Sequence, residues 1–345
     1  MKKLQFAMVG GGNGALIGDI HRIGAQFDDL ADLKAGCFSR HWDKNLEAGE
    51  KWGVEPGRIY PDYHTMLEEE AKRTGEDRLD FVVVATPNNT HYEIVKDIIA
   101  HGFHIVCDKP VTFTSRESEE LKALAQEKDL LFGVSYSYAH YAILEQAKKM
   151  IADGVLGKIH TIAAEYPQEW VGLNTALRGK DGLTWRVDPA ICGPSGVIAD
   201  IGTHVEYLIS KVTGLKPVRV LARLRSIPDY VPVESDAQVL IDYDNGAAGI
   251  FWTSFAMVGK SCCMKVRIYG DKGGMEWNAH DFMELRVDIA GQPTQIWSAN
   301  YDYCDPQARK SCRLPKGMPE AFHSLFANFY RGYCSHLLSR KEGKD

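Results

Sequence analysis

The sequence contains no run of apolar residues near the ~20 that a membrane-spanning helix needs. Its 345 residues include 40 Lys and Arg against 46 Asp and Glu, a formal net charge of −6. There is no basic stripe of the kind that binds nucleic acid or an acidic membrane surface. The apolar stretch in the opening MKKLQFAMVGGGNG spans about six residues, fewer than the roughly 7–15 of a secretion signal. We therefore expect no nucleic-acid partner, no membrane association and no export.

The cysteines form none of the patterns that indicate metal binding or a disulfide framework. The chain has eight of them, with no CxxC pair and no spaced Cys and His set of the zinc type. Several stand in apolar runs such as FHIVCD (103–108), where reduced cysteine acts as a small hydrophobic residue. We expect no metal site, and the reducing cytoplasm is the expected compartment.

Short apolar runs alternate with amphipathic segments through the first third of the chain. The segment HYEIVKDIIAHG (91–102), for example, has apolar residues at helical spacing. The runs that we predict to be buried strands are Leu4–Val9, Leu33–Phe38, Leu79–Thr86, Phe103–Asp108 and Leu130–Val134. Such alternation predicts βαβ units and a parallel sheet that is covered by helices on both faces.

The pattern changes after about residue 135, and the length of the chain also favours two domains. Longer extended runs follow, and Asp244–Gly246 has the Asp-Asn-Gly sequence of a hairpin turn. These runs predict a large, mostly antiparallel open sheet backed by helices. We predict an α/β protein with a dinucleotide-binding domain at residues 1–135. Residues 136–345 should form an α/β domain for substrate binding and oligomerisation.

Five of the fourteen residues in VGGGNGALIGDIHR (9–22) are glycine, directly after the first predicted strand. Gly10 can make a sharp turn, Gly12 and Gly14 can let a pyrophosphate approach the backbone, and Gly18 can let a helix pack closely. The spacing differs from G-x-G-x-x-G, and a tight turn without a ligand is the alternative. The expected cofactor contacts at this Rossmann-type turn are Gly10, Gly12, Asn13, Gly14 and Ala15.

The end of the second predicted strand bears on the choice of dinucleotide. An acidic residue there would bind the ribose hydroxyls of NAD. Ser39 and Arg40 stand there instead, and a hydroxyl with a guanidinium suits the 2′-phosphate of NADP. Arg40 could also stack on adenine or lie in solvent while NAD binds. The cofactor is therefore NAD or NADP, with a slight preference for NADP.

The segments TPNNTH (86–91) and CDKPVT (107–112) follow two of the predicted strands. Ligands of open α/β sheets lie beyond the carboxyl ends of strands, so both should face the cofactor. Lys109 directly follows a buried strand, where partial desolvation would lower its pKa toward the range useful for proton transfer. Lys109–Pro110 is a candidate cis peptide bond. The expected cofactor contacts here are Thr86, Pro87, Asn88, His91, Asp108 and Lys109.

A further candidate segment is GPSGVIADIGTH (193–204) in the second domain. Asp200 and His204 are four residues apart and would share one face of a helix. Gly196 and Gly202 would allow close approach by a neighbouring segment. The alternative interpretation is an Asp that caps a helix and a His that belongs to the core.

In this order, the residues resemble the family of glucose–fructose oxidoreductase, inositol dehydrogenase and the rhizopine catabolism protein. Its members pair a Rossmann domain that ends in E-K-P with a second domain that carries G-x-x-x-D-x-G-x-H. The segments that carry the resemblance are Gly10–Arg22, Thr86–His91, Asp108–Pro110, Glu165–Trp170, Trp185–Pro189 and Gly196–His204. Asp108 replaces the commoner Glu. The chain also ends after AFHSLFANFYRGYCSHLL (321–338), where many relatives add a segment.

The resemblance implies hydride transfer between a carbinol carbon of a sugar or cyclitol and a nicotinamide. It implies that His204 is the general base, that Asp200 orients it or binds a neighbouring hydroxyl, and that Lys109 binds the reacting oxygen. Lys109 and His204 could exchange these roles. The open sheet of the second domain favours a homodimer or homotetramer.

Substrate recognition should combine polar groups with an aromatic wall. Trp185 and Arg186 are also expected near the cofactor, although Trp170 and Trp185 could simply be core residues. Arg178, Lys180 and Arg186 could hold an anionic substituent or form a solvated loop. The expected substrate contacts are Asn88, His91, Lys109, Tyr166, Gln168, Trp170, Arg186, Asp200 and His204.

Two other functions use much the same residues. In the first, a glycosidase would oxidise C3 transiently, expel the aglycone by elimination and then return the hydride. In the second, a redox sensor would bind nucleotide without catalysis, and would be expected to lose Lys109, Asp200 or His204. All three are present, so a dehydrogenase is the prediction and the glycosidase its alternative.

Overall fold

The computed structural model describes residues 2–344, which form two compact units. The first contains the residues up to Ser137 together with those from Phe322 on, and the second is Tyr138–Ala321. The predicted division assigned residues 322–345 to the second domain. The helix α11 (Phe322–Lys341) belongs to the first unit instead. The α/β fold class is confirmed in both units.

The first unit is built on a five-stranded sheet in the order β2-β1-β3-β4-β5, with every pairing parallel. All five predicted strands are present, to within two residues at each end. Apolar runs without alternation formed these strands because both faces of the sheet are covered. Their bounds are β1 Leu4–Gly10, β2 Ala31–Cys37, β3 Phe81–Ala85, β4 His104–Cys107 and β5 Phe132–Val134.

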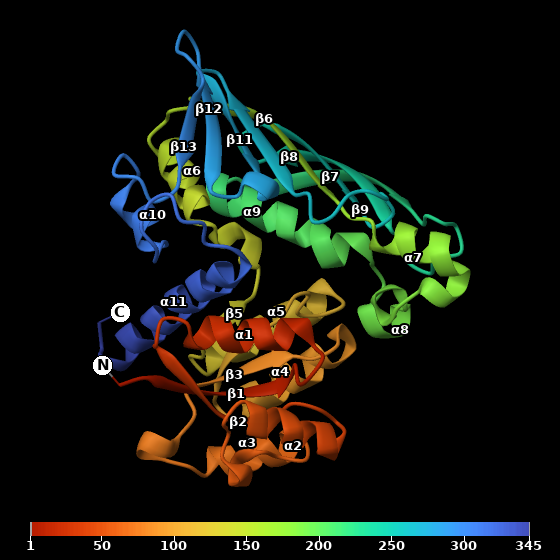
Figure 1. Cartoon of the computed structure of the whole chain (residues 1–345), viewed down its shortest axis with the longest axis vertical. Helices are drawn as coiled ribbons and strands as arrows, with labels where there is room; N and C mark the ends of the chain where they lie inside the picture. Colours follow the sequence, from red (N-terminus) through yellow and green to blue (C-terminus); the bar gives the residue numbers. More distant parts are fainter. Residues whose placement is uncertain (1, 345) are drawn as a thin grey trace. The chain divides into compact units, whose positions relative to one another are not determined.

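Helices cover both faces of this sheet. On one face, Ile20 of α1 and several aromatic residues of α11 pack against Phe6 and Phe81, and α11 lies beside α1 (Figure 1). On the other face, apolar side chains of α3, α4 and α5 form a second core. The bounds are α1 Leu16–Gln26, α2 Trp42–Lys51, α3 Tyr63–Ala71, α4 His91–Ala100 and α5 Ser115–Glu127.

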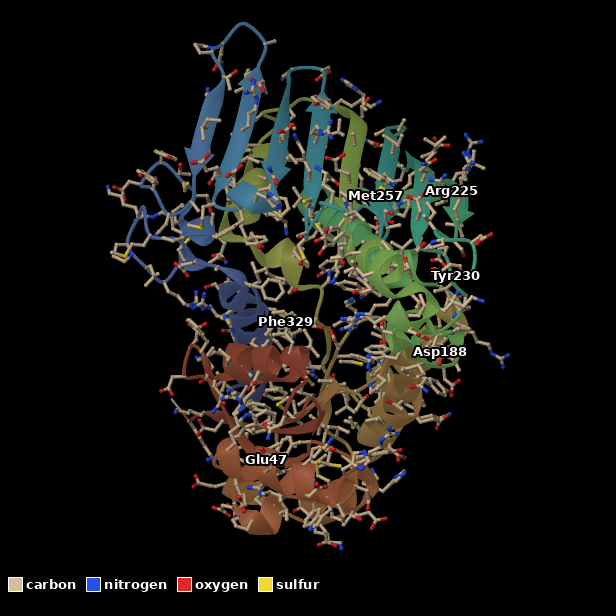
Figure 2. The ribbon with its side chains drawn as sticks, turned by 45° about the vertical axis from the view of Figure 1, so that its right-hand side comes forward. Glu47, Asp188, Arg225, Tyr230, Met257 and Phe329 are labelled. Atoms are coloured by element: carbon tan, nitrogen blue, oxygen red, sulfur yellow. The ribbon has the colours of Figure 1, made fainter. Side chains whose placement is uncertain are left out.

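One face of α11 carries aromatic side chains that are buried in the core of the first unit. Tyr330 is 1% exposed, and Phe329 and Tyr333 are also buried; Figure 2 shows Phe329 on this helix. Arg331 adds a two-pronged ion pair with Asp28, with both N–O distances 2.8 Å. Together these contacts explain why a segment 300 residues from the strands it covers completes their core.

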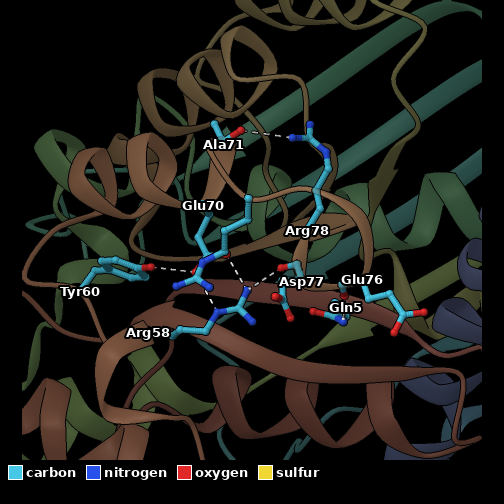
Figure 3. Close-up of polar contacts among 9 residues, drawn as sticks. Gln5, Arg58, Tyr60, Glu70, Ala71, Glu76, Asp77 and Arg78 are labelled. Carbon is cyan, nitrogen blue, oxygen red and sulfur yellow. Dashed lines mark hydrogen bonds and ion pairs between the residues drawn. The ribbon is translucent and has the colours of Figure 1, made fainter.

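A buried polar cluster fixes α3 to the chain that precedes it (Figure 3). The guanidinium of Arg58 donates to both carboxylate oxygens of Glu70, at 2.9 and 2.5 Å, and to the carbonyl of Asp77 at 3.2 Å. The hydroxyl of Tyr60 donates to Glu70 at 2.8 Å, and burial together with Glu70 raises the pKa of Tyr60 to about 12. Glu70 is fully buried, so this part of the unit depends on a paired charge.

The second unit carries an eight-stranded sheet in the order β13-β12-β11-β10-β6-β9-β8-β7. Only β6 and β9 pair in parallel, so the sheet is mostly antiparallel as predicted. The predicted hairpin turn joins β8 to β9. The bounds are β6 Ile159–Pro167, β7 Pro217–Arg225, β8 Asp236–Tyr243, β9 Ala248–Ser254, β10 Lys265–Gly270, β11 Gly273–Asn278, β12 Glu284–Ile289 and β13 Gln295–Ser298.

This second sheet has one covered face and one exposed face. In β8 buried and exposed residues alternate, as expected when a sheet is covered on one side only. The helices of the unit are α6 Ala142–Ala152, α7 Trp170–Arg178, α8 Pro189–Cys192, α9 Thr203–Thr213 and α10 Pro306–Lys310. Across residues 2–344, no helix is both long and apolar enough to cross a bilayer.

Candidate active site

The glycine-rich turn between β1 and α1 is shaped mainly by contacts of the protein with itself. Gly10 has φ +80°, and a Cβ there would lie 2.6 Å from Cγ2 of Thr86. A Cβ on Gly18 would lie 1.9 Å from the carbonyl oxygen of Gly11. Gly10 therefore makes the turn and Gly18 lets α1 pack closely, as predicted.

Gly12 and Gly14 differ in how closely other atoms surround them. The Gly12 N–H donates to the carbonyl of Phe38 at 3.0 Å, and a Cβ on Gly12 would lie 2.7 Å from that oxygen. The carbonyl of Phe38, the residue after β2, thus requires a glycine at position 12. Gly14 has φ +86°, is exposed, and has no atom within 4 Å of its Cβ position. The space that an approaching ligand needs is at Gly14.

The first turn of α1 fits an anion. Its N-cap is Ala15, which provides no capping side chain, and Leu16 is 79% exposed. Backbone N–H groups at a helix start need an external acceptor and favour negative charge. With Gly14 open beside them, these residues fit the pyrophosphate of a dinucleotide.

The loop after β2 is fixed by Asn45, which is fully buried. Its side chain accepts from the Phe38 N–H at 2.7 Å and donates to the Tyr60 carbonyl at 2.6 Å. This loop presents Ser39, whose Oγ accepts from the His41 N–H at 3.1 Å, and Arg40, which is exposed. Both are placed as predicted at the end of β2.

A basic residue that the sequence analysis missed also reaches the glycine-rich turn. Nζ of Lys51, in the last turn of α2, donates to Oδ1 of Asn13 at 3.3 Å. No local pattern in the sequence indicates this contact, because it joins residues 38 positions apart.

The segment after β3 is tied to the segment after β4 by His91. Its Nδ1 lies 2.8 Å from the Pro110 carbonyl oxygen, and its Nε2 lies 2.9 Å from the Thr86 carbonyl oxygen. The ring is 1% exposed. This differs from the prediction that His91 contacts cofactor or substrate, because both ring nitrogens bind backbone. Pro87 is exposed and Asn88 half-buried in the same segment.

Asp108 and Lys109 follow β4 directly, and the Lys109–Pro110 peptide bond is cis. The Asp108 carboxylate accepts from the Lys109 N–H at 2.9 Å and from the Ser135 hydroxyl at 2.6 Å. Burial alone would raise the pKa of Asp108, but His21, Lys109 and Ser135 outweigh it and hold the pKa well below its usual range. The ionised carboxylate thus fixes the backbone of Lys109 at the carboxyl end of the sheet.

A buried polar chain extends from Asp108 to α11. Nε2 of His21 on α1 lies 3.9 Å from Oδ1 of Asp108, and Nδ1 of the same ring lies 2.7 Å from the hydroxyl of Tyr330. His21 is fully buried and packs edge-on against Phe326. Sequence reasoning missed His21, Ser135 and Tyr330. His21 stands in the Gly10–Arg22 segment, but no local pattern connects it to a residue 309 positions away.

In the second unit, Asp200 lies in the π-helical turn Ile198–Gly202, which runs directly into α9. The cap of this segment is Glu234, which accepts from the Ser195 hydroxyl at 2.6 Å and the Gly196 N–H at 2.9 Å. A Cβ on Gly196 would lie 2.5 Å from the Glu234 carbonyl oxygen. Gly196 therefore allows close approach as predicted, and Asp200 is not the capping residue that the alternative required.

His204 is 6% exposed and lies on α9 against an aromatic pair. Its ring packs edge-on against Tyr138 at 5.0 Å between centroids. The Tyr166 hydroxyl donates to the Tyr138 hydroxyl at 2.7 Å. Tyr166 is 1% exposed, so it supports Tyr138 rather than lining a ligand surface as predicted. Tyr138 is the residue that the sequence analysis missed here.

The remaining candidates in the second unit divide into core and surface. Trp170 is half-buried and packs on Phe255 at 4.7 Å between centroids, as in the core alternative. Trp185 is 38% exposed, and the guanidinium of the exposed Arg186 lies 4.7 Å from its ring. Gln168 is half-buried.

The cationic loop residues are all on the surface. Arg178, Lys180 and Arg186 are exposed, and Nζ of Lys180 lies 5.5 Å from the ring of Tyr230. Lys180 and Arg186 thus each lie near an aromatic ring on an exposed segment. Among the described residues, no group of three or more His, Cys, Asp or Glu side chains could hold a metal ion.

Comparison with known proteins matches two family models. Residues 4–136 match the oxidoreductase family with an NAD-binding Rossmann fold, and residues 144–276 match the GFO/IDH/MocA C-terminal domain. An oxidoreductase named YfiI from Bacillus subtilis is 37% identical over 332 residues, which are 95% of this chain and 84% of the relative.

Solved structures agree with these matches. An inositol dehydrogenase homolog from Azotobacter vinelandii, complexed with NAD+, is 35% identical with a TM-score of 0.93, covering 99% of this chain and 88% of that one. Its structure with NADH and myo-inositol is 34% identical with a TM-score of 0.90 and the same coverage.

Proposed function

The chain belongs to the GFO/IDH/MocA family of NAD-binding oxidoreductases, and from this premise we propose that it oxidises a secondary hydroxyl of a sugar, glycoside or cyclitol. The family matches confirm the resemblance that the sequence indicated. The substrate class is supported by a relative whose structure is titled with NADH and myo-inositol. The cofactor is a nicotinamide dinucleotide, which accepts the hydride when bound.

The observation that carries the proposal is the placement of Lys109. Its backbone is held by the half-buried, ionised Asp108 at the carboxyl end of a parallel sheet. This is the edge at which ligands of such sheets bind. A cation held there stabilises negative charge that develops on a reacting oxygen.

The residues proposed to hold the dinucleotide lie at the ends of three strands. Backbone N–H groups at Gly14 and in the first turn of α1 would hold the pyrophosphate, because this turn is open and α1 lacks a capping side chain. The N–H of Ala15 itself donates to the Gly12 carbonyl at 3.0 Å. Ser39 and Arg40 would contact the adenosine ribose or its 2′-phosphate. Thr86–Asn88 would line the nicotinamide side. The slight preference for NADP is supported by Arg40 and by the nearby Lys51.

The catalytic roles follow from the chemistry of alcohol oxidation. His204 takes the hydroxyl proton, which avoids forming a free alkoxide. Asp200 orients His204 or binds a neighbouring hydroxyl, and Lys109 donates a hydrogen bond to the reacting oxygen. In the reverse assignment Lys109 is the base. Lys109→Arg separates the two, because a guanidinium keeps the charge but does not give up its proton.

The experiment that tests the function is a dehydrogenase screen with both nucleotides. It covers hexoses, uronates, sulfosugars, inositols and their aryl glycosides, and follows the absorbance of the reduced nicotinamide. We expect stoichiometric reduction with a free sugar or cyclitol. Release of aglycone with only catalytic cofactor would instead support the redox-assisted glycosidase. No turnover of either kind across the screen would contradict the proposed substrate class.

We also propose that the protein is a homo-oligomer, with the exposed face of the second sheet as its interface. Leu221, Leu240 and Ile250 are paired across β7, β8 and β9 and are 68%, 52% and 51% exposed. A contiguous apolar row on a sheet favours association. Leu240→Lys should lower the mass measured by light scattering; an unchanged mass would exclude this face.

The cytoplasm is the proposed compartment. All eight cysteines are free thiols, and a reducing environment preserves them.

A further inference from the structure

The eight cysteines fall into two groups by environment. Most are buried, and burial raises the pKa of their thiols, to about 11 in Cys37 and about 12 in Cys334. Such thiols carry little thiolate and react slowly. The buried ones are Cys37, Cys107, Cys192, Cys304 and Cys334, whereas Cys262 is exposed and Cys263 and Cys312 are half-buried. The accessible thiols therefore include two that are adjacent in the chain.

Cys263 has a proton acceptor within reach. Its Sγ lies 3.3 Å from Nε2 of His280 and 3.3 Å from the carbonyl oxygen of Ser261. The same imidazole nitrogen lies 3.3 Å from the Ser261 carbonyl oxygen. The backbone N–H of His280 donates to Oδ1 of Asn278 at 3.0 Å. In the tautomer that leaves Nε2 unprotonated, an imidazole at this distance can take the thiol proton and stabilise the thiolate.

Cys262 lies beside Gln168 and Tyr138, and Tyr138 contacts His204. It has φ +49°, a left-handed conformation that few residues other than glycine adopt. Its Sγ lies 3.9 Å from Nε2 of Gln168. Burial is the main cause of the raised pKa of Tyr138, and Cys262 adds to it. Because Tyr138 packs on His204, a change at Cys262 would reach the candidate substrate residues of this unit.

We propose that Cys262 and Cys263 form a hydroperoxide-sensitive dithiol, and that its closure to a vicinal disulfide weakens substrate binding. The second half rests on the proposed function, because His204 is assigned to the substrate there. Ring closure moves Sγ of Cys262 toward Cys263 and so changes the contacts of Gln168 and Tyr138.

The chemistry balances with a hydroperoxide as the oxidant. His280 takes the Cys263 proton, and the thiolate attacks the O–O bond to give a sulfenic acid. The hydroxide or alkoxide that leaves takes the proton back from His280. The Cys262 thiol then attacks the sulfenic sulfur, forming the S–S bond and releasing water. Both sulfur atoms are oxidised, and the hydroperoxide is reduced.

The first test maps the thiols and needs no enzymatic activity. The full chain is treated with hydrogen peroxide, alkylated and digested with trypsin, which releases both cysteines in the peptide 261–265. We expect this peptide to lose its free thiols first, as an internal disulfide that dithiothreitol reverses. His280→Gln should slow the loss about tenfold, because the variant removes the imidazole that lies 3.3 Å from Sγ of Cys263 and accepts its proton. Cys312→Ser, the matched control, should leave the rate unchanged.

Equal oxidation of Cys312, oxidation to sulfonic acids without a disulfide, or an unchanged rate of thiol loss in His280→Gln would overturn the proposed dithiol.

The second test compares oxidised and reduced protein with the substrate that the screen identifies. KM should rise while the Kd of the dinucleotide stays the same, and dithiothreitol should restore KM. A formed disulfide with unchanged KM would overturn the link to substrate binding. A protein without dehydrogenase activity would still show the disulfide, so the two failures are distinguishable.

Discussion

The two units hold their candidate catalytic residues in different ways. In the first, Lys109 follows a strand of a sheet that is covered on both faces, and Asp108 and His21 form a buried polar chain behind it. In the second, His204 lies on α9, which follows a π-helical turn whose first N–H groups are bound by Glu234, and its ring packs on Tyr138. The first arrangement suits a fixed cofactor, whereas the second leaves room for variation in substrate. The predictions below test this contrast.

The largest effect should come from His204 in the second unit. In His204→Gln the base is lost, so kcat should fall about 10²–10⁴-fold, the usual contribution of a general base. The Kd of the dinucleotide should stay the same, because the residues proposed to bind it lie in the first unit. Steady-state kinetics and nucleotide fluorescence titration measure both quantities. A loss of nucleotide affinity in the same variant would contradict the assignment of dinucleotide binding to the first unit.

The two units should also differ in the free energy of unfolding that is lost when one of their ion pairs is removed. Arg58→Ala removes both guanidinium hydrogen bonds to the fully buried Glu70 and leaves that carboxylate with the Tyr60 hydroxyl and with Arg73 at 3.5 Å, which should cost about 3 kcal/mol in free energy of unfolding. Arg225 of the second unit, labelled in Figure 2, provides the comparison. Its partner Asp236 is also buried and keeps a hydrogen bond from Trp252 at 2.8 Å, but the Arg225 side chain is 39% exposed against 7% for Arg58, so water already screens this pair. Urea denaturation should therefore show a smaller loss for Arg225→Ala, and equal losses would contradict this account.

Cofactor choice should respond to Arg40. If its guanidinium binds the 2′-phosphate, Arg40→Ala should weaken NADP by about 1.5–3 kcal/mol, as expected for a charged hydrogen bond. NAD binding should change little. Isothermal titration with each nucleotide measures the difference, and Lys51→Ala tests the second cation in the same way. Equal weakening of both nucleotides would remove Arg40 from this role.

The smallest effects should come from the two supporting tyrosines. Tyr330→Phe leaves Nδ1 of buried His21 without its partner, and should cost about 1–3 kcal/mol of stability and lower kcat through Asp108. Tyr166→Phe removes the hydrogen bond to Tyr138 and should raise KM instead. Thermal unfolding and kinetics distinguish the two. A loss of stability in Tyr330→Phe without any change in kcat would restrict the His21 chain to a structural role.

Much of this architecture follows from local patterns. The five parallel strands, the hairpin at Asp244–Gly246 and the turn at Gly10 could be predicted because each depends on residues close in sequence. The burial of Tyr166 could also have been predicted. It shares the period-two face of β6 with Ile162 and Ala164, both of which are buried.

Other features depend on pairs far apart in the chain. The return of α11 to the first sheet and the contact of Tyr330 with His21 join segments that no local pattern connects. Gly12 was assigned to a ligand, although it is the Phe38 carbonyl that requires a glycine there. The capping of the Asp200 segment by Glu234 is likewise a tertiary contact between residues about forty positions apart.

The most direct test of the central claim is Lys109→Ala, with nucleotide affinity and turnover measured on the same preparation. Lys109 is assigned to the chemical step, so the dinucleotide should bind with unchanged Kd while kcat falls about 10²–10⁴-fold. Turnover close to that of the wild-type protein, with only Kd increased, would contradict the account.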